Sequence, residues 1–343
     1  MAVINGKTMN KAINFHGISN ASWFEDILII LKSKYTMISI DELEDMYYND
    51  KKITNSCHLT FDDGDISFYK LVYPILKRHN VPATIFVSPT IIKEQKNFWF
   101  QEIAGYDHQE VKKIICEVLD IRLAVLNNYS LNAIIKCLKI EQIWAILEAY
   151  QRRFNIAPKE PCNISIDQLI EIDSYGLVKI GAHTLNHPIL ANENDEKSSS
   201  EITDSIKGLQ EILGHEIKYF AYPNGFPIID FGHREINFLK ENNCKIAFSC
   251  EPGSFSILNN PLSIDRIGFS HGSLFFVRTK LILGGYWDSV RDFILKGEIQ
   301  TRIEIDTMIL KRSVLNNMKG KSGRLLRSIS KIAHIKNNKK NHY

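Results

Sequence analysis

Residues 58–65, HLTFDDGD, carry an apolar strand directly into two adjacent carboxylates and a glycine. Like charges side by side repel each other and are hard to bury. The pair therefore fits either a solvated Asx-type turn or a site at which a cation and a proton each need their own carboxylate. The segments on either side of this stretch bear on the choice.

Strand-like and helical segments alternate along most of the chain. Short runs rich in β-branched and aromatic residues predict strands, and apolar residues at helical spacing predict the helices between them. The predicted strands are AINFHGI (12–18), CHLTF (57–61), VPATIFVSP (81–89), LVKIGAH (177–183), IKYFAYP (217–223), CKIAFS (244–249) and SIDRIGF (263–269). The predicted helices include WFEDILIILKSKY (23–35), about 200–213, and HREINFLKEN (233–242).

Individual residues predict where some of these helices begin, bend and end. Apolar residues at helical spacing also predict a helix over ISFYKLVYPILKRHN (66–80). Pro74 should kink or split this helix, because proline removes a backbone donor. Ser165 and Gln168 form a capping box that opens a helix, which Gly176 can close. Between Ile91 and about Pro161 only helical periodicity is present, as in EQIWAILEAYQRRF (141–154). This segment predicts a helical insertion between two strands.

Strands that alternate with helices indicate an α/β fold with a parallel sheet covered by helices. About seven such units predict a closed or nearly closed (β/α) barrel, with an open doubly wound sheet as the alternative. In barrels of this type, chemistry takes place at the C-terminal ends of the strands. Three polar clusters follow predicted strands in this chain: DDG (62–64), HTLNHP (183–188) and YPNG (222–225).

The second cluster contains two histidines, His183 and His187, four residues apart. Pro188 disfavours a helical conformation for His187, so we expect a strand end that turns into a loop. Alone, the pair fits two ordinary hydrogen-bonded histidines as well as two ligands. With one carboxylate of the DDG cluster it forms a three-ligand set that leaves positions open on a divalent metal. The second carboxylate can then accept the proton of an attacking water.

Composition excludes several classes of protein. A hydrophobic content of 44% over 343 residues predicts a soluble globular protein. Ten Lys or Arg and no acid lie between Lys311 and Tyr343, so the rest of the chain has an acidic excess, which argues against nucleic-acid binding. The six cysteines are scattered without a Cys-x-x-Cys pair, and we expect reduced thiols. The N-terminal residues resemble no secretory signal, and we expect a cytoplasmic protein.

The three polar clusters also resemble the motifs of a known family. TFDDG (60–64), HTLNHP and FAYPNG (220–225), in this order, look like the first three motifs of the polysaccharide deacetylases, the NodB-homology or carbohydrate esterase family 4 group. NFHGI (14–18) and SIDRIGF resemble the branch that includes exopolysaccharide N-deacetylases. The resemblance covers roughly Ile13 to Phe269 and implies a distorted (β/α) barrel of about seven parallel strands. We therefore expect a barrel over 1–310, a helical insertion over 91–161, and a basic tail over 311–343.

The resemblance also implies roles for individual residues. Asp62 would be the general base, and Asp63, His183 and His187 would hold a divalent metal, usually zinc. The backbone N–H of Asn224 would donate to the oxyanion. Many members carry an Arg in the third motif that orients the base, but Ala221 stands at that position here.

Two further residues are predicted to line the site. Arg266, on the last predicted strand, is the candidate replacement for the missing Arg, although a surface or helix-capping role fits it as well. His16, at the end of the first strand, fits either a site-lining or a purely structural role. The histidine motif that supplies the family's general acid has no match, since His271 fits an ordinary loop histidine, so the acid is unassigned.

The resemblance implies a metal-dependent hydrolase that removes N-acetyl groups from an acetamido sugar in a polysaccharide or glycan precursor. Two alternatives are a deformylase or O-deacetylase of the same superfamily and a non-catalytic glycan-binding module. The aromatic cluster Phe98–Phe100 either packs in the core or stacks on a sugar ring. Family members that act on finished surface polymers are usually exported, so we expect a cytoplasmic enzyme whose basic tail contacts an anionic membrane or remains solvated.

Overall fold

The computed structural model of the chain describes residues 9–269, 272–283, 297 and 299–308. The described residues form two compact units, one within Met1–Gly105 and Leu138–Lys296 and the other within Tyr106–Cys137 and Gly297–Tyr343. His271 and the predicted basic tail (311–343) lie outside the described residues. The six cysteines all lie in the described part of the chain, and none of them forms a disulfide.

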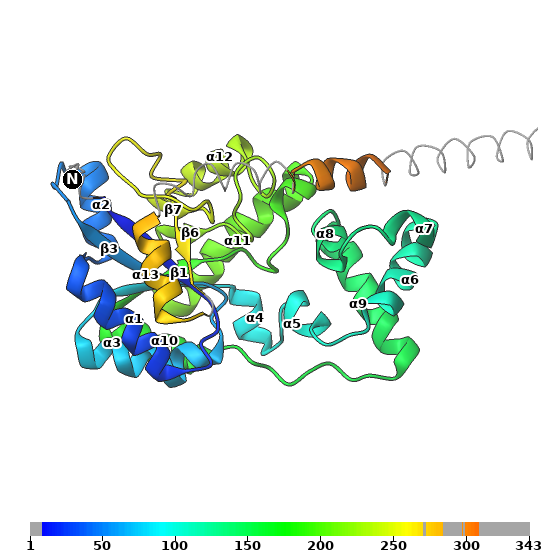
Figure 1. The fold of residues 1–343 in the computed structure, drawn as a ribbon, viewed down its shortest axis with the longest axis horizontal. Coiled ribbons are helices and arrows are strands. Elements are labelled where there is room, and N and C mark those ends of the chain that lie inside the picture. Colours follow the sequence, from blue (N-terminus) through cyan, green and yellow to red (C-terminus); the bar gives the residue numbers. More distant parts are fainter. Residues whose placement is uncertain (1–8, 270–271, 284–296, 298, 309–343) are drawn as a thin grey trace, which may run out of the picture. The chain divides into compact units, whose positions relative to one another are not determined.

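A single parallel sheet forms the centre of the first unit (Figure 1). Its strands pair in the order β7-β6-β5-β4-β3-β1-β8, and the short strand β2 pairs with β3 beside this path. Every strand pair is parallel. The strands are β1 (Lys11–Phe15), β2 (Thr36–Met37), β3 (Ser56–Phe61), β4 (Ala83–Val87), β5 (Val178–Ala182), β6 (Tyr219–Ala221), β7 (Ile246–Phe248) and β8 (Ile267–Gly268).

The two edges of this sheet approach each other. Phe248, the last residue of β7, forms a parallel bridge with Ile264, only three residues before β8, and β8 pairs with β1. An open doubly wound sheet would reverse its strand order at a switch point, whereas this order is nearly sequential around the sheet. The fold is therefore a distorted (β/α) barrel, as predicted, and the doubly wound alternative is wrong.

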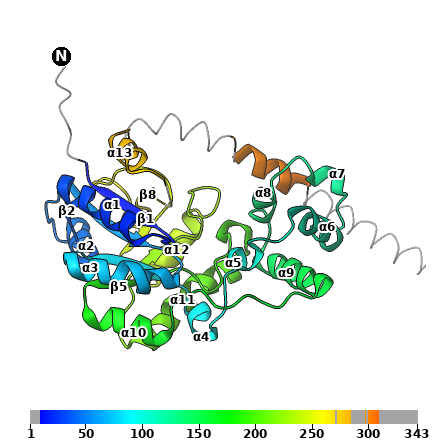
Figure 2. The same ribbon diagram turned by 60° about the horizontal axis from the view of Figure 1, so that its bottom comes forward.

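Helices surround the strands of the first unit (Figures 1 and 2). They are α1 (Ala21–Lys34), α2 (Ile40–Tyr48), α3 (Tyr73–His79), α10 (Ile166–Tyr175), α11 (Asp195–Leu213), α12 (His233–Glu241) and α13 (Leu274–Leu283). Pro74 splits its helix as predicted, because a π-helical turn (Phe68–Val72) ends where α3 begins with the proline in its first turn. The capping box of Ser165 and Gln168 opens α10, and Gly176 ends it at φ 78°.

Two helices differ from the sequence prediction. Helix α11 begins at Asp195 rather than near residue 200, because the side chain of Asn194 accepts a hydrogen bond from the Lys197 N–H and caps the helix. Helix α2 was not predicted, although Ser39 and Glu42 form a capping box at its start.

The alternation of side chains along β3 determines what the barrel encloses. Cys57, Leu59 and Phe61 face the apolar layer between the sheet and its helices, whereas His58 and Thr60 point to the opposite face and are fully buried inside the barrel. Because side chains alternate along a strand, Asp62 continues the inward-facing series. The polar stretch thus begins within the barrel rather than on its surface.

Only helices and loops lie between Glu94 and Pro161. Helices α4 (Pro89–Glu94), α5 (Trp99–Ile103) and α9 (Ile140–Phe154) belong to the first unit, whereas α6 (His108–Leu119), α7 (Leu123–Leu126) and α8 (Leu131–Ile135) belong to the second, together with residues 299–308. The segment 91–161 is thus helical, as predicted, and the domain limits of 1–310 and 311–343 stay predictions. Within the described residues, no helix is both long and apolar enough to span a membrane.

Candidate active site

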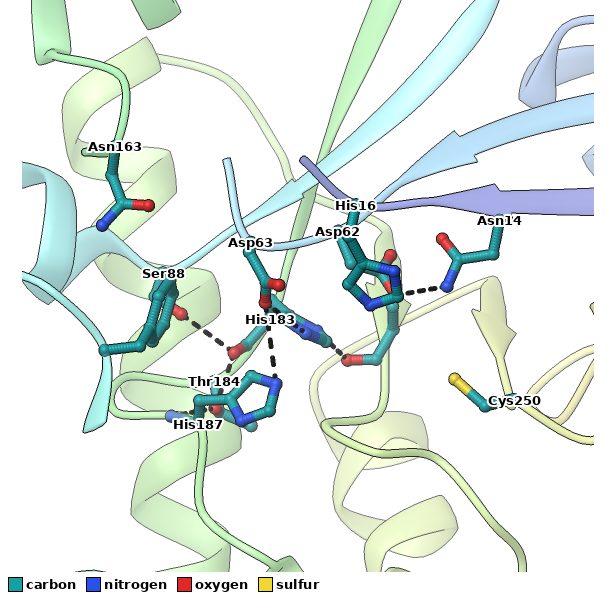
Figure 3. A network of polar contacts seen from close by, with 12 residues as sticks. Asn14, His16, Asp62, Asp63, Ser88, Asn163, His183, Thr184, His187 and Cys250 are labelled. Atoms are coloured by element: carbon teal, nitrogen blue, oxygen red, sulfur yellow. Dashed lines mark hydrogen bonds and ion pairs between the residues drawn. The ribbon is translucent and has the colours of Figure 1, made fainter. Parts of the chain in front are cut away.

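Three predicted ligands converge at the C-terminal ends of β3 and β5 (Figure 3). Oδ1 of Asp63 lies 3.5 Å from Nε2 of His183 and 3.6 Å from Nε2 of His187. One potential ligand atom from each residue falls within 4.8 Å of the other two, and all three residues are buried. The geometry thus brings together the carboxylate and the two imidazoles expected from the sequence.

The backbone after β3 separates the two adjacent carboxylates. Asp63 and Gly64 both have a left-handed conformation, with φ 73° and 71°. A Cβ on Gly64 would lie 2.9 Å from the Val87 side chain, so glycine is required there for space as well as for conformation. Because the chain turns at this point, Asp62 points into the barrel while Asp63 points toward the histidines. The solvated-turn alternative is therefore wrong.

The histidine rings are prepared to offer lone pairs. Nδ1 of His183 lies 2.7 Å from the Ala221 carbonyl, to which it donates, so its Nε2 is left as the acceptor. Burial lowers the pKa of His187 to about 3, which keeps that ring neutral. Burial disfavours the charged form of His183 as well, but the carboxylates of Asp63 and Asp62 outweigh this effect. The pKa of His183 is therefore raised above its ordinary value.

One oxygen of Asp63 has no hydrogen-bond partner among the described residues. This oxygen, Oδ1, is buried, and leaving it without a donor is costly for a carboxylate. A divalent cation between Asp63, His183 and His187 would satisfy this oxygen, and one carboxylate with two imidazoles suits zinc. The donor atoms therefore fit the metal that the sequence predicts.

The second carboxylate, Asp62, is held on three sides. Arg266 donates from Nη1 to Oδ1 at 2.8 Å and from Nη2 to Oδ2 at 2.9 Å, and Nδ2 of Asn14 donates to Oδ2 at 3.0 Å. Burial raises the pKa of the Asp62 carboxyl, but the Arg266 guanidinium outweighs burial and lowers it below its ordinary value. Asp62 is therefore an oriented, ionised carboxylate that stands apart from the candidate ligand set of Asp63, His183 and His187.

Arg266 reaches Asp62 from the segment that closes the barrel. It immediately precedes β8 and is fully buried, and its remaining donors contact the Ser249 carbonyl and the Thr60 hydroxyl. A surface or capping role for Arg266 is excluded by these contacts. Ala221 contributes only its carbonyl to the site, through His183. Arg266 thus contacts the carboxylate that the Arg of the third motif is expected to orient. A role of Arg266 in catalysis stays a prediction.

The remaining predicted residues are less closely tied to this group. His16 follows β1, is half exposed, and has Nε2 4.0 Å from Oδ2 of Asp62. Asn224 follows β6 in a left-handed conformation at φ 57°. Among the described residues its backbone N–H has no acceptor, and its side-chain Nδ2 is buried without a partner. No hydrogen bond within the described part of the chain links Asn224 to Asp62 or to the histidines.

Sequence reasoning missed Asn14 and only partly anticipated the aromatic cluster. Asn14, on β1, lies two residues before His16, which directly follows the strand, so the two-residue period of a strand predicts both side chains on one face. The rings of Phe98, Trp99 and Phe100 lie 5.6, 6.4 and 4.9 Å from the His187 ring. Phe98 and Trp99 are buried, so stacking of the whole cluster on a sugar is wrong, and only Phe100 keeps exposed surface.

The fold is an α/β barrel, and its candidate site combines a possible metal centre with a carboxylate held by an arginine. This combination is typical of hydrolases. The family model for polysaccharide deacetylase matches residues 49–230, which is more than half of the chain. The chain belongs to the polysaccharide deacetylase family.

Solved structures share this fold at low sequence identity. Deacetylase PplD of Streptococcus pyogenes, solved in complex with acetate, is 18% identical with a TM-score of 0.51, covering 76% of this chain and 92% of that chain. The BpsB deacetylase domain of Bordetella bronchiseptica is 17% identical with a TM-score of 0.50, covering 77% and 97%. A de-N-acetylase of Aggregatibacter actinomycetemcomitans is 14% identical with a TM-score of 0.53, covering 79% and 98%. A comparison with curated proteins finds no match.

Proposed function

We propose that this protein is a metal-dependent hydrolase that removes N-acetyl groups from an acetamido sugar in a polysaccharide or glycan precursor. The observation that carries the proposal is the convergence of Asp63, His183 and His187 around an unpaired carboxylate oxygen, beside the separately held Asp62. Family membership supports it, as does a fold shared with a de-N-acetylase and with a deacetylase solved with acetate.

Asp63, His183 and His187 would hold the metal, and zinc suits this donor set. When bound, a divalent metal supplies Lewis-acid activation of the acetyl carbonyl and of the attacking water. The Ala221 carbonyl fixes the tautomer of His183, which a ligand histidine requires. The aromatic rings around His187 keep bulk water from that side of the site.

Asp62 would accept the proton of the attacking water. A carboxylate offers about four acceptor positions, and Arg266 and Asn14 use three of those on Asp62. Among the described residues this leaves a position on Oδ1 for water. The lowered pKa keeps the carboxyl ionised at neutral pH, which a proton acceptor requires.

Charge that develops on the acetyl oxygen needs a donor. The backbone N–H of Asn224 has no acceptor among the described residues and is the candidate for this role. A single oxyanion donor is typically worth about 3 kcal/mol of transition-state stabilisation. His16 is half exposed near Asp62, so a substrate can reach it.

A screen of acyl sugars tests the substrate class. Purified zinc-loaded protein is incubated with chito-oligosaccharides and with O-acetylated and N-formylated analogues, and acetate, formate and free amine are measured. We expect acetate and amine in equal amounts from the N-acetyl substrates alone. Faster release from the O-acetyl or N-formyl analogues would favour the related hydrolases. Binding of glycan without release of any acid by the zinc-loaded protein would favour a non-catalytic binding module.

A further inference from the structure

The turn that joins the two ligand histidines has a strained backbone. Thr184 and His187 both lie in the left-handed region, at φ 61° and 56°. This conformation is uncommon for any residue with a side chain and is strained for the β-branched Thr184, and such strain persists only where the surrounding structure holds it. The turn therefore needs contacts that offset its conformational cost.

Side chains from two other segments hold the ends of this turn. The Ser88 hydroxyl donates to the His183 carbonyl at 3.0 Å, and Nε1 of Trp99 donates to the His187 carbonyl at 2.9 Å. Within the turn, the Thr184 hydroxyl accepts from the His187 N–H at 3.0 Å. These contacts leave the backbone N–H groups at the middle of the turn to be satisfied elsewhere.

Glu201, on α11, satisfies that middle part. Its Oε2 accepts from the backbone N–H of Leu185 at 3.0 Å and from that of Asn186 at 2.9 Å. Its Oε1 accepts from Nδ2 of Asn186 at 2.8 Å and lies 3.1 Å from Nζ of Lys197, one turn earlier on the same helix. Glu201 has no exposed surface, so this carboxylate is fully committed to the turn and to Lys197.

We propose that Glu201 is a positioning residue that fixes the turn between His183 and His187, so that both imidazoles face Asp63 and bind metal together. This inference rests on the proposed function of the site. One oxygen accepts both backbone N–H groups of the turn, and the other accepts from the Asn186 side chain. The charge is tolerated in a buried position because Lys197 and the charge-assisted hydrogen bonds compensate it.

The proposal separates acceptor geometry from charge. In Glu201→Gln, one amide oxygen can still accept both backbone N–H groups, as Oε2 does now, and the Asn186 amide can rotate to meet the new NH₂ group. In Glu201→Asp, the charge is kept but the carboxylate is one methylene too short to reach the turn. In Glu201→Ala, both backbone donors lose their acceptor. Lys197→Met is the matched control, since it removes the ion pair and leaves the turn contacts.

Metal affinity is measured on full-length protein by competition with a chromophoric chelator for Zn²⁺, with the Co²⁺ absorption spectrum as a probe of coordination. Circular dichroism of the metal-free proteins establishes that each variant is folded. We expect Glu201→Ala and Glu201→Asp to bind Zn²⁺ about 10- to 100-fold more weakly, as for other residues that orient metal ligands. Glu201→Gln and Lys197→Met should stay within about threefold of wild type, with an unchanged Co²⁺ spectrum.

The outcomes that overturn the inference differ from those that overturn the function. If wild type binds Zn²⁺ and folded Glu201→Ala binds it equally well, Glu201 does not position the ligands and the inference is wrong. A loss in Glu201→Gln at least as large as in Glu201→Asp would also contradict it, because a side chain that keeps the acceptor geometry would then not hold the turn. Should Glu201→Ala not fold, the pair of Gln and Asp variants decides the question. Wild-type protein that binds no Zn²⁺ would instead overturn the proposed function itself.

Discussion

The two aspartates at the end of β3 are adjacent in sequence but serve different surroundings. A left-handed turn at Asp63 and Gly64 sends one carboxylate to Arg266 and the other to the histidines. This division explains how two like charges are buried side by side, because each carboxylate has cationic or metal-binding partners of its own. It also lets the two residues be tested separately.

Asp62→Asn should keep the metal but lose turnover. A neutral amide cannot accept the proton of water, whereas Asp63, His183 and His187 are unchanged, so we expect kcat to fall by about 10²- to 10⁴-fold at wild-type zinc content. His183→Ala should lose zinc and activity together. Acetate release and zinc content of the purified variants provide the measurement. An Asp62→Asn enzyme with activity within a few-fold of wild type would remove Asp62 as the base.

Arg266→Lys tests whether the paired hydrogen bonds to Asp62 matter beyond charge. Lysine keeps the positive charge but cannot donate in parallel to both oxygens. We expect kcat to fall by about 10-fold or more, since small misplacement of a catalytic group is costly, while zinc affinity is unchanged. Steady-state kinetics and zinc titration of the variant measure both effects. A variant with wild-type kcat would limit Arg266 to a structural role.

At the scale of single elements, local sequence signals predicted much of the fold. These signals depend only on neighbouring residues, as with Pro74 at the start of α3 and the capping box of Ser165 at the start of α10. Both are found in the structure as predicted. The contact of Arg266 with Asp62 spans 204 residues and depends on how the barrel closes through Phe248 and Ile264. Local patterns carry no information on such a contact, so the sequence offered Arg266 only as one candidate.

His58, inside the barrel on β3, should make the stability of the folded protein sensitive to acid. Burial lowers its pKa to about 4 from the ordinary 6.5. The unfolded chain therefore binds a proton below about pH 6.5 while the folded protein stays neutral at this residue until about pH 4. Stability contributed by neutral His58 is fully present above pH 6.5 and is lost as pH falls toward 4, by about 3 kcal/mol in total.

Urea unfolding between pH 7 and pH 4 measures this effect. Relative to His58→Gln, whose side chain does not titrate, the wild-type free energy of unfolding should fall by about 3 kcal/mol more over this range. Gln at the exposed His233 is the matched control and should follow wild type. Parallel pH curves for wild type and His58→Gln would contradict the assignment.

At the scale of the whole molecule, the barrel and its order of motifs were predictable, whereas the division into units was not. The sequence showed that residues 91–161 are helical, but periodicity cannot tell which helices pack together. Only tertiary contacts divide α6, α7 and α8 from α4, α5 and α9. The core role offered for Phe98 and Trp99 is confirmed by their burial, but their packing around His187 could not be predicted for the same reason.

The basic segment 311–343 predicts a salt-dependent contact with an anionic membrane. Each Lys or Arg near such a surface contributes on the order of 1 kcal/mol, and ten of them lie in this segment. The full chain should co-sediment with vesicles that contain phosphatidylserine at low salt, and a chain that ends at Lys311 should remain in solution. Equal partitioning of both proteins onto these vesicles would rule out the segment as the anchor.

Metal-dependent acetate release tests the central claim most directly. Wild-type protein is stripped with a chelator, and its rate of acetate release from an N-acetylated chito-oligosaccharide is measured as Zn²⁺ is added back. We predict that the stripped protein is inactive and that the rate rises in proportion to bound zinc up to one ion per chain. Full acetate release by the metal-free protein, or none at one bound zinc per chain, would contradict the account.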